Sequence, residues 1–302
     1  MTPRGAGRPE RAPRGAGRPE RAPRGAGRPE RSPRGAGRPE RQSKRPGARS
    51  TGREREGLGG DVIEGRRAVR ELLAAGRRPV RSVWIAEGLD PSPLLDEIEE
   101  LAARRRVRVE NVSRARLEAS ARTEAPQGVI ARARAVEPVG VDELAVPGRG
   151  SPFLVVVAGV TDPRNLGALL RSAECAGVTG VVLPRHRSAH LTPTVAKVAA
   201  GAIEHLDFAL VGGIPSVLER LSSLGFFSFG LAADAARSIY DADIGAGPVA
   251  LVVGGEERGL APLVRRRCDE VVKIPQHGGL ESLNAGVAAA VACFEVARRR
   301  LG

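Results

Sequence analysis

The chain has 302 residues, of which 41% are hydrophobic and 27% are charged. This composition excludes a wholly disordered or fibrous protein, and the length allows a sizeable core divided over two domains. The net charge is +13, yet residues 1–60 hold 17 Lys and Arg against 6 Asp and Glu, so the rest of the chain is nearly neutral. The positive charge that favours nucleic acid therefore lies mainly in the N-terminal segment.

The sequence contains no run near the roughly 18 consecutive apolar residues that cross a bilayer, and its N-terminus lacks the apolar stretch of a signal peptide. The three cysteines, Cys175, Cys268 and Cys293, lie far apart without CxxC spacing, which argues against a disulfide framework and a structural zinc site. We therefore expect a cytoplasmic protein with no membrane partner and no metal.

Residues 1–60 form a repetitive tail in which PRGAGRPE occurs four times at a period of ten. Gly, Pro and Arg dominate it, and no aromatic residue precedes Trp84, so little apolar surface is available to offset the entropy of ordering. We expect a disordered tail. It either tethers the protein to RNA through phosphate contacts or is a solvated extension without that role.

Ordered structure is expected from Asp61 onward. Apolar spacing over 61–75 indicates a strand followed by a helix that Gly76 ends. A small α/β domain over 61–136 then continues with strands at 80–86, 107–112 and 128–133 and a helix at 93–105. Pro, Gly and acidic residues over 137–151 are typical of a linker.

From residue 152 to residue 302, apolar strands alternate with helices, which predicts an α/β domain with a parallel sheet wrapped by helices. The expected strands are 153–158, 181–183, 206–210, 226–231, 249–253 and 271–274. The expected helices are 162–176, 195–202, 215–224, 262–267 and 282–300. Asp162 and Pro163 are typical of a helix N-cap and first turn.

Three polar clusters each follow a predicted strand directly, at the end where open α/β sheets bind ligands. They span 161–167, 254–259 and 274–284. Asn165 and, six residues later, Arg171 are expected to face one cleft. Gly254 and Gly255 permit either a tight turn or a close approach of ligand to backbone. Ser282, taken alone, could equally be the N-cap of the last helix or a ligand-binding residue.

Together these clusters resemble the three motifs of the SpoU family, also called the TrmH family, of RNA ribose 2′-O-methyltransferases. The segments are DPRNLGALLRSAECAG (162–177), LVVGGEERGL (251–260) and IPQHGGLESLNAGVAAAV (274–291). EGRRAV (64–69) and PQGVIA (126–131) resemble the family's small ribosomal-protein-like RNA-binding module. The pairing of domains is most similar to the guanosine methyltransferases of large-subunit (23S) rRNA. Gly286 and Arg258 depart from the pattern of many relatives, which carry a serine and an acidic or small residue there.

The resemblance implies a trefoil knot in the C-terminal domain that holds S-adenosylmethionine, and a homodimer. It places four residues against this cofactor: Gly254, Gly255, Ile274 and Leu283. The implied reaction is transfer of the donor's methyl group to a ribose 2′-hydroxyl of RNA, most readily of a guanosine in 23S rRNA.

The family's functional positions fall on five residues: Asn165, Arg171, Glu256, Ser282 and Asn284. Arg171 is expected to orient the hydroxyl and a phosphate, because a guanidinium with a pKa above about 12 is a poor base. Asn165, Glu256 and Asn284 would fix the geometry. Ser282 would cap the last helix while lining the site.

Several alternatives stay open at this stage. One is a tRNA methyltransferase, or a resistance-type adenosine methyltransferase, of the same family. Another is a non-catalytic RNA-binding factor in ribosome assembly, against which the intact motif residues argue. An oxidoreductase with a nucleotide-binding sheet is disfavoured, since no GxGxxG fingerprint follows a strand.

Overall fold

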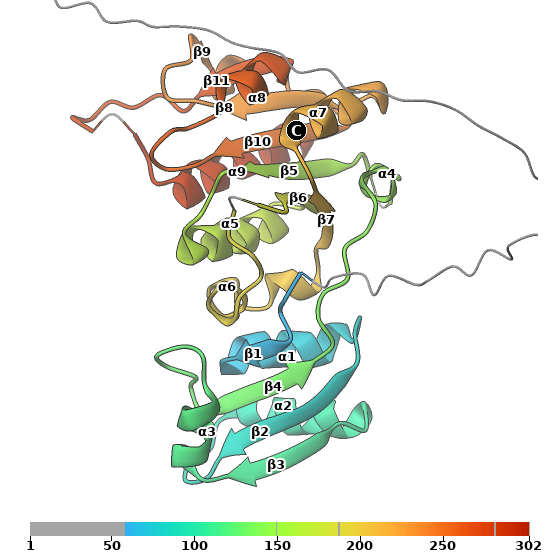
Figure 1. Ribbon diagram of the computed structural model, residues 1–302, viewed down its shortest axis with the longest axis vertical. Coiled ribbons are helices and arrows are strands. Elements are labelled where there is room, and N and C mark those ends of the chain that lie inside the picture. The colour runs from blue at the N-terminus through green and yellow to red at the C-terminus, as the bar shows by residue number, and fades with distance from the viewer. Residues whose placement is uncertain (1–57, 149, 187, 281, 302) are drawn as a thin grey trace, which may run out of the picture. The chain divides into compact units, whose positions relative to one another are not determined.

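The computed structural model describes residues 58–148, 150–186, 188–280 and 282–301, so the predictions made for residues 1–57 lie outside the described residues. Two β-sheets organise the described part of the chain (Figure 1). We call residues 62–133, which contain the first sheet, the small domain, and residues 153–301, which contain the second, the large domain. None of the helices in these residues combines the length and the apolar character that crossing a membrane requires.

Four strands form the sheet of the small domain, in the order β1-β4-β2-β3. Their bounds are β1 (Val62–Glu64), β2 (Val80–Ala86), β3 (Arg108–Val112) and β4 (Val129–Ala133). Strand β4 is antiparallel to β1 and β2, whereas β2 and β3 are parallel. Helices α1 (Arg66–Ala75) and α2 (Pro93–Arg104) pack on one face, and α3 (Arg114–Ser120) places Leu117 against the other.

Seven parallel strands form the sheet of the large domain, in the order β7-β6-β5-β10-β8-β11-β9. This confirms the predicted parallel sheet. The strands are β5 (Phe153–Ala158), β6 (Gly180–Pro184), β7 (Asp207–Val211), β8 (Phe227–Leu231), β9 (Arg237–Ser238), β10 (Val249–Gly254) and β11 (Glu270–Lys273).

Helices bury both faces of this sheet. Along β5, Val155 and Val157 belong to the core on one face and Val156 to the core on the other, because successive side chains of a strand alternate. The first face is covered by α5 (Pro163–Cys175), α6 (Pro193–Val198), α9 (Ala285–Leu301) and the 3-10 helices η1 (Ala202–Glu204) and η2 (Ile239–Asp241). The second is covered by α4 (Val141–Leu144), α7 (Ile214–Ser223) and α8 (Pro262–Arg267). Burial on both faces explains the continuous apolar runs of the strands.

The strand order of the large sheet reverses between β5 and β10. From β5 the chain continues to β6 and β7 on one side, whereas β8, β11 and β9 lie beyond β10 on the other (Figure 1). At the carboxyl ends of the two central strands, Ala158 lies opposite Gly254. Open α/β sheets bind their ligands outside the carboxyl ends of strands at such a reversal.

Two predicted helix bounds are wrong. The helix expected at 195–202 ends at Val198, because Ala200 and Gly201 have φ angles of 52° and 100°, which no right-handed helix contains. The last helix begins at Ala285 instead of at Ser282. The trefoil knot implied by the resemblance stays a prediction.

A buried ion pair joins the two domains, which belong to one compact unit. Arg78 donates from Nε and Nη2 to the two carboxylate oxygens of Glu204 at 2.9 and 2.5 Å. The two side chains are 9% and 4% exposed. Nη1 of Arg78 donates to the carbonyl oxygens of Gly60 and Arg134. The buried charges are thus paired and hydrogen-bonded, which is the condition for a stable buried pair.

Residues 58–60 are also held by the large domain. Leu58 is buried in the core on the α5 side of the large sheet, and its backbone N donates to the carbonyl oxygen of Val136 at 2.9 Å. The backbone N of Gly60 donates to the carbonyl oxygen of Leu191 at 2.6 Å. The chain therefore contacts the large domain before it enters β1.

Candidate active site

The first polar cluster lies at the start of α5, directly after β5. Oδ1 of Asp162 accepts hydrogen bonds from the backbone N of Arg164 at 2.6 Å and of Asn165 at 3.3 Å. Pro163 follows at the first helical position, where the helix needs no N–H donor. The predicted N-cap is confirmed, and it places Asn165 in the first turn of α5.

Hydrogen bonds connect the three polar clusters through Asn165. Nδ2 of Asn165 donates to Oε1 of Glu256 at 2.6 Å. Oδ1 of Asn165 accepts a hydrogen bond from Nδ2 of Asn284 at 2.8 Å, across 119 positions of sequence. Three of the five predicted site residues therefore form one continuous chain of hydrogen bonds.

Asn284 also begins α9. Its Oδ1 accepts hydrogen bonds from the backbone N of Gly286 at 2.9 Å and of Val287 at 3.2 Å. These are the contacts of an N-cap residue, so the expectation that Ser282 caps the last helix is wrong. The amide of Asn284 thus caps the helix with its oxygen and holds Asn165 with its nitrogen.

A cavity of about 130 Å³ lies beside this chain of hydrogen bonds. Its lining includes Glu256, Ser282 and all four residues expected to contact the methyl donor: Gly254, Gly255, Ile274 and Leu283. Apolar side chains of the sheet and of α9 supply much of the remaining wall, among them Leu231, Val253, Val272 and Ala288. Apolar walls with a few converging polar groups are typical of ligand sites. The residues present therefore fit the adenosyl group of S-adenosylmethionine.

Close backbone contacts require the two glycines at the end of β10. A Cβ on Gly255 would lie 2.4 Å from the carbonyl oxygen of Gly159, and a Cβ on Gly254 would lie 2.3 Å from the carbonyl carbon of Gly259. The backbone N of Gly259 donates to the carbonyl oxygen of Gly255 at 3.0 Å and closes the turn that carries Glu256. Any side chain at either glycine would displace rigid backbone.

The two departures from the family pattern lie near this site. A Cβ on Gly286 would lie 3.0 Å from the carbonyl oxygen of Asn165 and 3.3 Å from Oδ1 of Asn284. Glycine at this position therefore lets the start of α9 approach α5 closely. Arg258 is an exposed residue of the turn that follows β10.

Arg171 lies apart from the other four predicted site residues. It follows Asn165 by six residues on α5, a rotation that leaves the two side chains roughly 120° apart around the helix. Arg171 lines a second, larger cavity of about 1040 Å³ between the two domains, and that lining includes none of the other four among the described residues. Asn165 is not in the lining of this cavity and is connected to the smaller one through its hydrogen bond to Glu256, so the expectation of one shared cleft stays a prediction.

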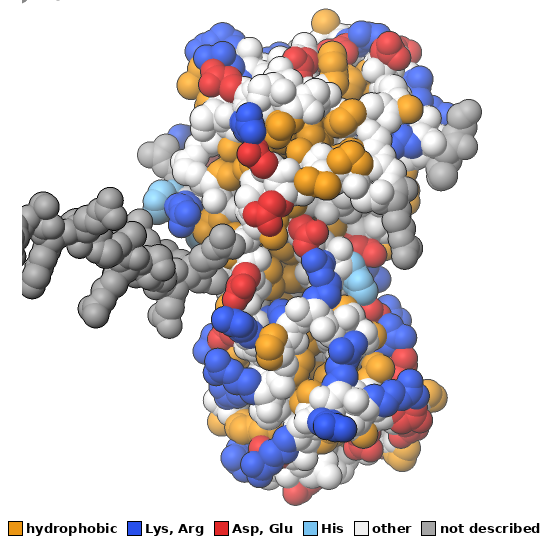
Figure 2. Space-filling view, turned by 90° about the vertical axis from the view of Figure 1, so that its right-hand side faces the viewer, with side chains coloured by type: hydrophobic (Ala, Val, Ile, Leu, Met, Phe, Trp, Pro, Cys, Tyr) orange, Lys and Arg blue, Asp and Glu red, His pale blue; other side chains and the backbone are white. Residues whose placement is uncertain are grey.

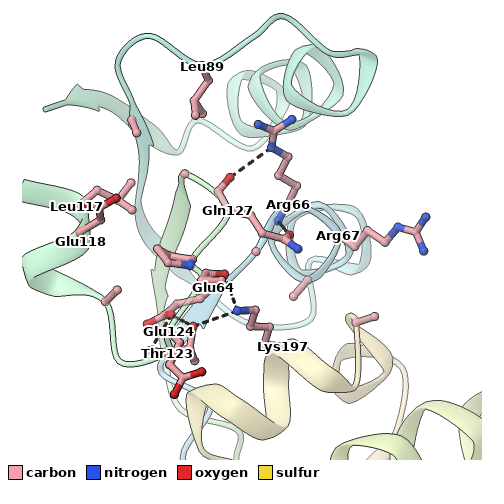
Figure 3. A pocket seen from close by; sticks show the side chains of 18 of the residues that line it. Glu64, Arg66, Arg67, Leu89, Leu117, Glu118, Thr123, Glu124, Gln127 and Lys197 are labelled. Atoms are coloured by element: carbon pink, nitrogen blue, oxygen red, sulfur yellow. Dashed lines mark hydrogen bonds between the residues drawn. The ribbon is translucent and has the colours of Figure 1, made fainter. Parts of the chain in front are cut away.

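Cationic side chains gather around the larger cavity. Arg66 and Arg67 of the small domain and Lys197 of the large domain line it (Figure 3). Arg114 of the small domain and Arg171 of the large domain belong to the same lining. The same lining contains fewer carboxylates, and that of Glu64 accepts hydrogen bonds from the protein backbone. A cavity with this surplus of positive charge favours a polyanion such as RNA.

Glu64 and Lys197 hold a loop that forms one wall of this cavity (Figure 3). Glu64 is fully buried, and its carboxylate accepts hydrogen bonds from the backbone N of Arg122 at 2.5 Å and of Thr123 at 3.1 Å. Lys197, on α6, donates to Oγ1 of Thr123 at 3.3 Å and to the carbonyl oxygen of Ala125. A side chain of the large domain thereby fixes a loop of the small domain.

Gln127 lines the same cavity in a strained conformation. Its φ of 55° lies in the left-handed region that favours glycine. Arg66 donates from its backbone N to Oε1 of Gln127 and from Nε to the carbonyl oxygen of Gln127, both at 3.2 Å (Figure 3). Strain of this kind is often found at binding sites.

Sequence reasoning missed the roles of Gln127, Glu64 and Lys197. The first two occur within PQGVIA and EGRRAV, which carried the resemblance without a role for either residue. Lys197 has no local signal at all. It reaches the site because α6 packs beside β1 of the other domain.

The described part of the chain contains no group of three or more His, Cys, Asp or Glu side chains that could hold a metal ion. Burial raises the pKa of Cys293 to about 12 and that of Cys268 to about 11. Both thiols are consequently neutral near pH 7 and are poor nucleophiles.

The parallel sheet, the motif residues at its reversal and the neighbouring basic cavity define an α/β enzyme that acts on a nucleic acid. A family model described as the SpoU rRNA Methylase family matches residues 152–294. A second model, for RNA 2′-O ribose methyltransferase substrate binding, matches residues 62–139. The chain belongs to the SpoU family of RNA methyltransferases.

Curated relatives align with this chain over most of their own length. The 23S rRNA (guanosine-2′-O-)-methyltransferase RlmB of Pseudomonas putida is 38% identical over 243 residues, covering 80% of this chain and 97% of that protein. The protein of the same name from Xanthomonas campestris is 40% identical with the same coverage of both chains.

Solved structures share the fold. A crystal structure of an RNA 2′-O ribose methyltransferase superposes with a TM-score of 0.65 at 29% identity, covering 80% of this chain and 89% of that chain. The methyltransferase AviRb of Streptomyces viridochromogenes, in complex with AdoMet, gives a TM-score of 0.66 at 23% identity, covering 80% of this chain and 90% of that chain.

Proposed function

We propose that this protein transfers a methyl group from S-adenosylmethionine to the ribose 2′-hydroxyl of a guanosine in 23S rRNA. The observation that carries the proposal is the hydrogen-bonded chain Asn284–Asn165–Glu256 beside the glycine-lined cavity. The choice of 23S rRNA is supported by relatives that bear this activity in their names and align with 80% of the chain.

The methyl donor, when bound, supplies a methyl group on a positively charged sulfur that leaves as a neutral thioether. Gly254, Gly255, Ile274 and Leu283 would hold it in the smaller cavity. The 2′-oxygen forms a bond to the methyl carbon as the carbon–sulfur bond breaks, and the hydroxyl proton passes to a base or to water. Since the donor is already activated, positioning supplies most of the acceleration.

Different side chains of the protein position the reacting groups and the RNA. Asn165, fixed by Glu256 and Asn284, orients the groups at the mouth of the donor cavity. Arg171, in the basic cavity, binds a phosphate of the RNA near the target nucleotide. A guanidinium is a poor base, so we assign Arg171 an orienting role and not that of the base.

Incubation with labelled S-adenosylmethionine tests the proposal against its alternatives. Unmodified 23S rRNA and tRNA are supplied separately, and the product is identified by nucleoside analysis. We expect 2′-O-methylguanosine in 23S rRNA, and loss of transfer in Asn165→Ala and Arg171→Ala. Methylation of tRNA alone would overturn the substrate. Absence of transfer to both RNAs, together with absence of donor binding by calorimetry, would favour the non-catalytic assembly factor.

Cys175 offers an independent test of the RNA path. Its thiol is exposed and lines a cavity together with Arg171 and Arg67, next to the large basic cavity. We expect 23S rRNA to slow the reaction of Cys175 with a maleimide, because bound RNA covers this wall. S-Adenosylmethionine alone should leave the rate unchanged. An unaltered rate at saturating RNA would place the RNA elsewhere.

We further propose that the protein is a homodimer that contacts its copy through α9. Val287 and Phe294 are each 50% exposed on this helix and lie seven residues apart, which puts them on one face. Leu283, 40% exposed, continues the apolar stripe at the start of the helix. An exposed apolar stripe of this kind supports a protein partner, here a second copy of the chain.

Sedimentation equilibrium tests the dimer. We expect a mass of about two chains for the wild type and about one for Phe294→Glu, because the carboxylate would be buried without a partner. Phe227→Glu, a similarly exposed phenylalanine on β8, serves as the control and should stay dimeric. A monomeric wild type would overturn this part of the proposal.

A further inference from the structure

Trp84, the single tryptophan of the sequence, lies half-buried on the face of the small sheet opposite α1 and α2. Its neighbours along β2, Val83 and Ile85, pack beneath those helices. Because side chains alternate along a strand, Trp84 belongs to the other face, where it packs with Leu117 of α3 and Ile130 of β4. Its indole therefore has one side against the core and the other toward solvent.

Two arginines approach this ring. Cζ of Arg116, on α3, lies 4.7 Å from the centre of the Trp84 ring. Cζ of Arg132, on β4, lies 5.3 Å from it. Both distances are within the range in which the ring attracts a cation. The indole thus attracts the guanidinium groups of two exposed residues.

Arg116 and Arg132 belong to the arginines of the small domain that form no ion pair with a described residue. Six other arginines of the small domain and its edge form ion pairs with carboxylates: Arg70, Arg77, Arg78, Arg104, Arg108 and Arg134. Among the described residues, no carboxylate lies within ion-pair distance of Arg116 or Arg132. Glu110, which faces Trp84 across the sheet, is paired with Arg108 at 3.3 Å. The part of the chain that the structure describes therefore provides no carboxylate as a counter-charge to these two guanidinium groups.

We propose that Arg116 and Arg132 bind phosphate groups of the RNA backbone and that Trp84 is the positioning residue that holds them. The inference rests on the proposed function, since it assigns a part of the RNA contact to this face. A guanidinium matches a phosphate with two parallel hydrogen bonds, and an aromatic ring restricts its orientation in advance. The small domain also displays many Arg side chains on the face seen in Figure 2.

Helix α3 connects this face to the basic cavity. Arg114 and Leu117 line the cavity, while Arg116 of the same helix stacks on Trp84. An RNA strand that occupies the cavity beside Arg171 thus meets Arg116 where it passes α3. The proposed contacts extend the path of the RNA away from the donor cavity and along the small domain.

The geometry favours phosphate over a stacked base. Base stacking needs a free aromatic face, whereas two guanidinium groups already lie within about 5 Å of the Trp84 ring centre. A base would have to displace them and lose their attraction to the ring. Phosphate oxygens can bind to the same groups without any displacement.

Tryptophan fluorescence tests the site directly, because all tryptophan emission comes from Trp84. Unmodified 23S rRNA is titrated into the protein while binding is followed in parallel by filter retention. We expect the intensity or wavelength of the emission to change with the binding curve, and S-adenosylmethionine alone to leave it unchanged. An emission that stays constant while RNA binds would overturn the proposal.

Substitutions measure the contribution of each arginine. Arg116→Gln and Arg132→Gln should each weaken RNA binding about three- to tenfold. Each should also lower the slope of log affinity against log salt by about 0.7 to 0.9, the value for one lost phosphate contact. The matched control is Arg104→Gln, on α2 at the other side of the same domain, which should change neither quantity. An unchanged slope in both test variants would contradict the phosphate contact.

Trp84→Phe separates positioning from packing. This variant retains an aromatic ring and should preserve most of the salt slope. Trp84→Leu should lower the slope as far as the combination of Arg116→Gln with Arg132→Gln does. Circular dichroism verifies the folding of each variant, and the arginine variants decide the matter if Trp84→Leu unfolds. RNA binding that responds to these changes without any methyl transfer would refute the proposed function alone. Methyl transfer with unaltered binding in every variant would refute this inference alone.

Discussion

Asn284 donates a hydrogen bond to Asn165 at 2.8 Å, and the same side chain caps α9. The start of the last helix and the first turn of α5 are therefore fixed by one amide group. Glu256 completes the arrangement from the turn after β10. At this point of the molecule, the side chains predicted to act in the reaction also fix the start of two helices.

Asn165→Asp tests this arrangement with almost no change in volume. The new carboxylate can still accept from Asn284, but it replaces the donor that faces Glu256 at 2.6 Å with a second acceptor. We expect single-turnover methyl transfer to slow by about tenfold to hundredfold, the loss typical of a hydrogen bond to a charged group. Lower pH should restore part of the rate, because a proton shared by two close carboxyl groups restores the hydrogen bond. Asn111→Asp, at an exposed position of β3, is the control.

Gly255→Ala tests the need for close backbone contact at the donor cavity. The added Cβ would lie 2.4 Å from the carbonyl oxygen of Gly159, so the ends of β5 and β10 must separate. We expect the affinity for S-adenosylmethionine, measured by calorimetry, to fall at least about tenfold, which corresponds to roughly 1.4 kcal/mol. Gly245→Ala has open space around the new methyl group and should bind the donor normally. Equal affinities in the two variants would show that the turn tolerates a side chain.

Arg78 and Glu204 are expected to contribute strongly to stability as a pair. Removal of one partner, in Arg78→Met or Glu204→Gln, leaves a buried group unpaired and should lower the free energy of unfolding by about 3–5 kcal/mol. Removal of both should cost less than the sum of the single changes. The exposed pair of Arg104 and Glu100 is the comparison, and its loss should change the free energy by less than about 1 kcal/mol. Urea unfolding distinguishes the two cases.

Glu295 should make the stability of the protein dependent on pH. Hydrogen bonds from Arg298 and from Arg299 lower the pKa of this buried carboxyl group from 4.5 to about 2. Because the pKa is depressed in the folded state, the stabilisation is complete above pH 4.5 and is lost as the pH falls toward 2.

Glu295→Gln isolates this contribution. The difference in the free energy of unfolding between wild type and variant should reach up to about 3 kcal/mol at pH 7 and should narrow between pH 5 and pH 3. Glu118→Gln, at an exposed position of α3, should show no such trend. A difference that is independent of pH would mean that the variant affects packing and not charge.

Six of the seven strands of the large sheet could be predicted because their cause is local, whereas the two-residue strand β9 was not predicted. The apolar run at 153–158 is β5 itself, since a strand buried on both faces needs no polar residue. The start of α9 could not be predicted in the same way. Ser282 and Asn284 are both good N-cap residues, and the contact of Asn284 with Asn165, far away in sequence, decides between them.

The same distinction applies to the sites. The motif letters brought Asn165, Glu256 and Asn284 together correctly. Asn165 and Glu256 follow β5 and β10, the two strands at the reversal of the sheet, whereas Asn284 follows β11. The placement of Arg171 beside the small domain depends on how the two domains pack against each other, and no local sequence pattern predicts that packing. The arginines that partly cover the ring of Trp84 come from a helix and from another strand, so no local pattern indicates them either.

The burial of Leu58 in the large domain means that the two domains are attached at more points than the connecting segment after residue 133. Leu58, the Arg78–Glu204 pair and Lys197 all cross the boundary without using that segment. A protease cut beside the exposed Val146 should therefore give two fragments that remain together on gel filtration and separate only in denaturant. The protein would behave after such a cut as a tight two-chain complex, which makes this position suitable for splitting the enzyme into halves that reassemble.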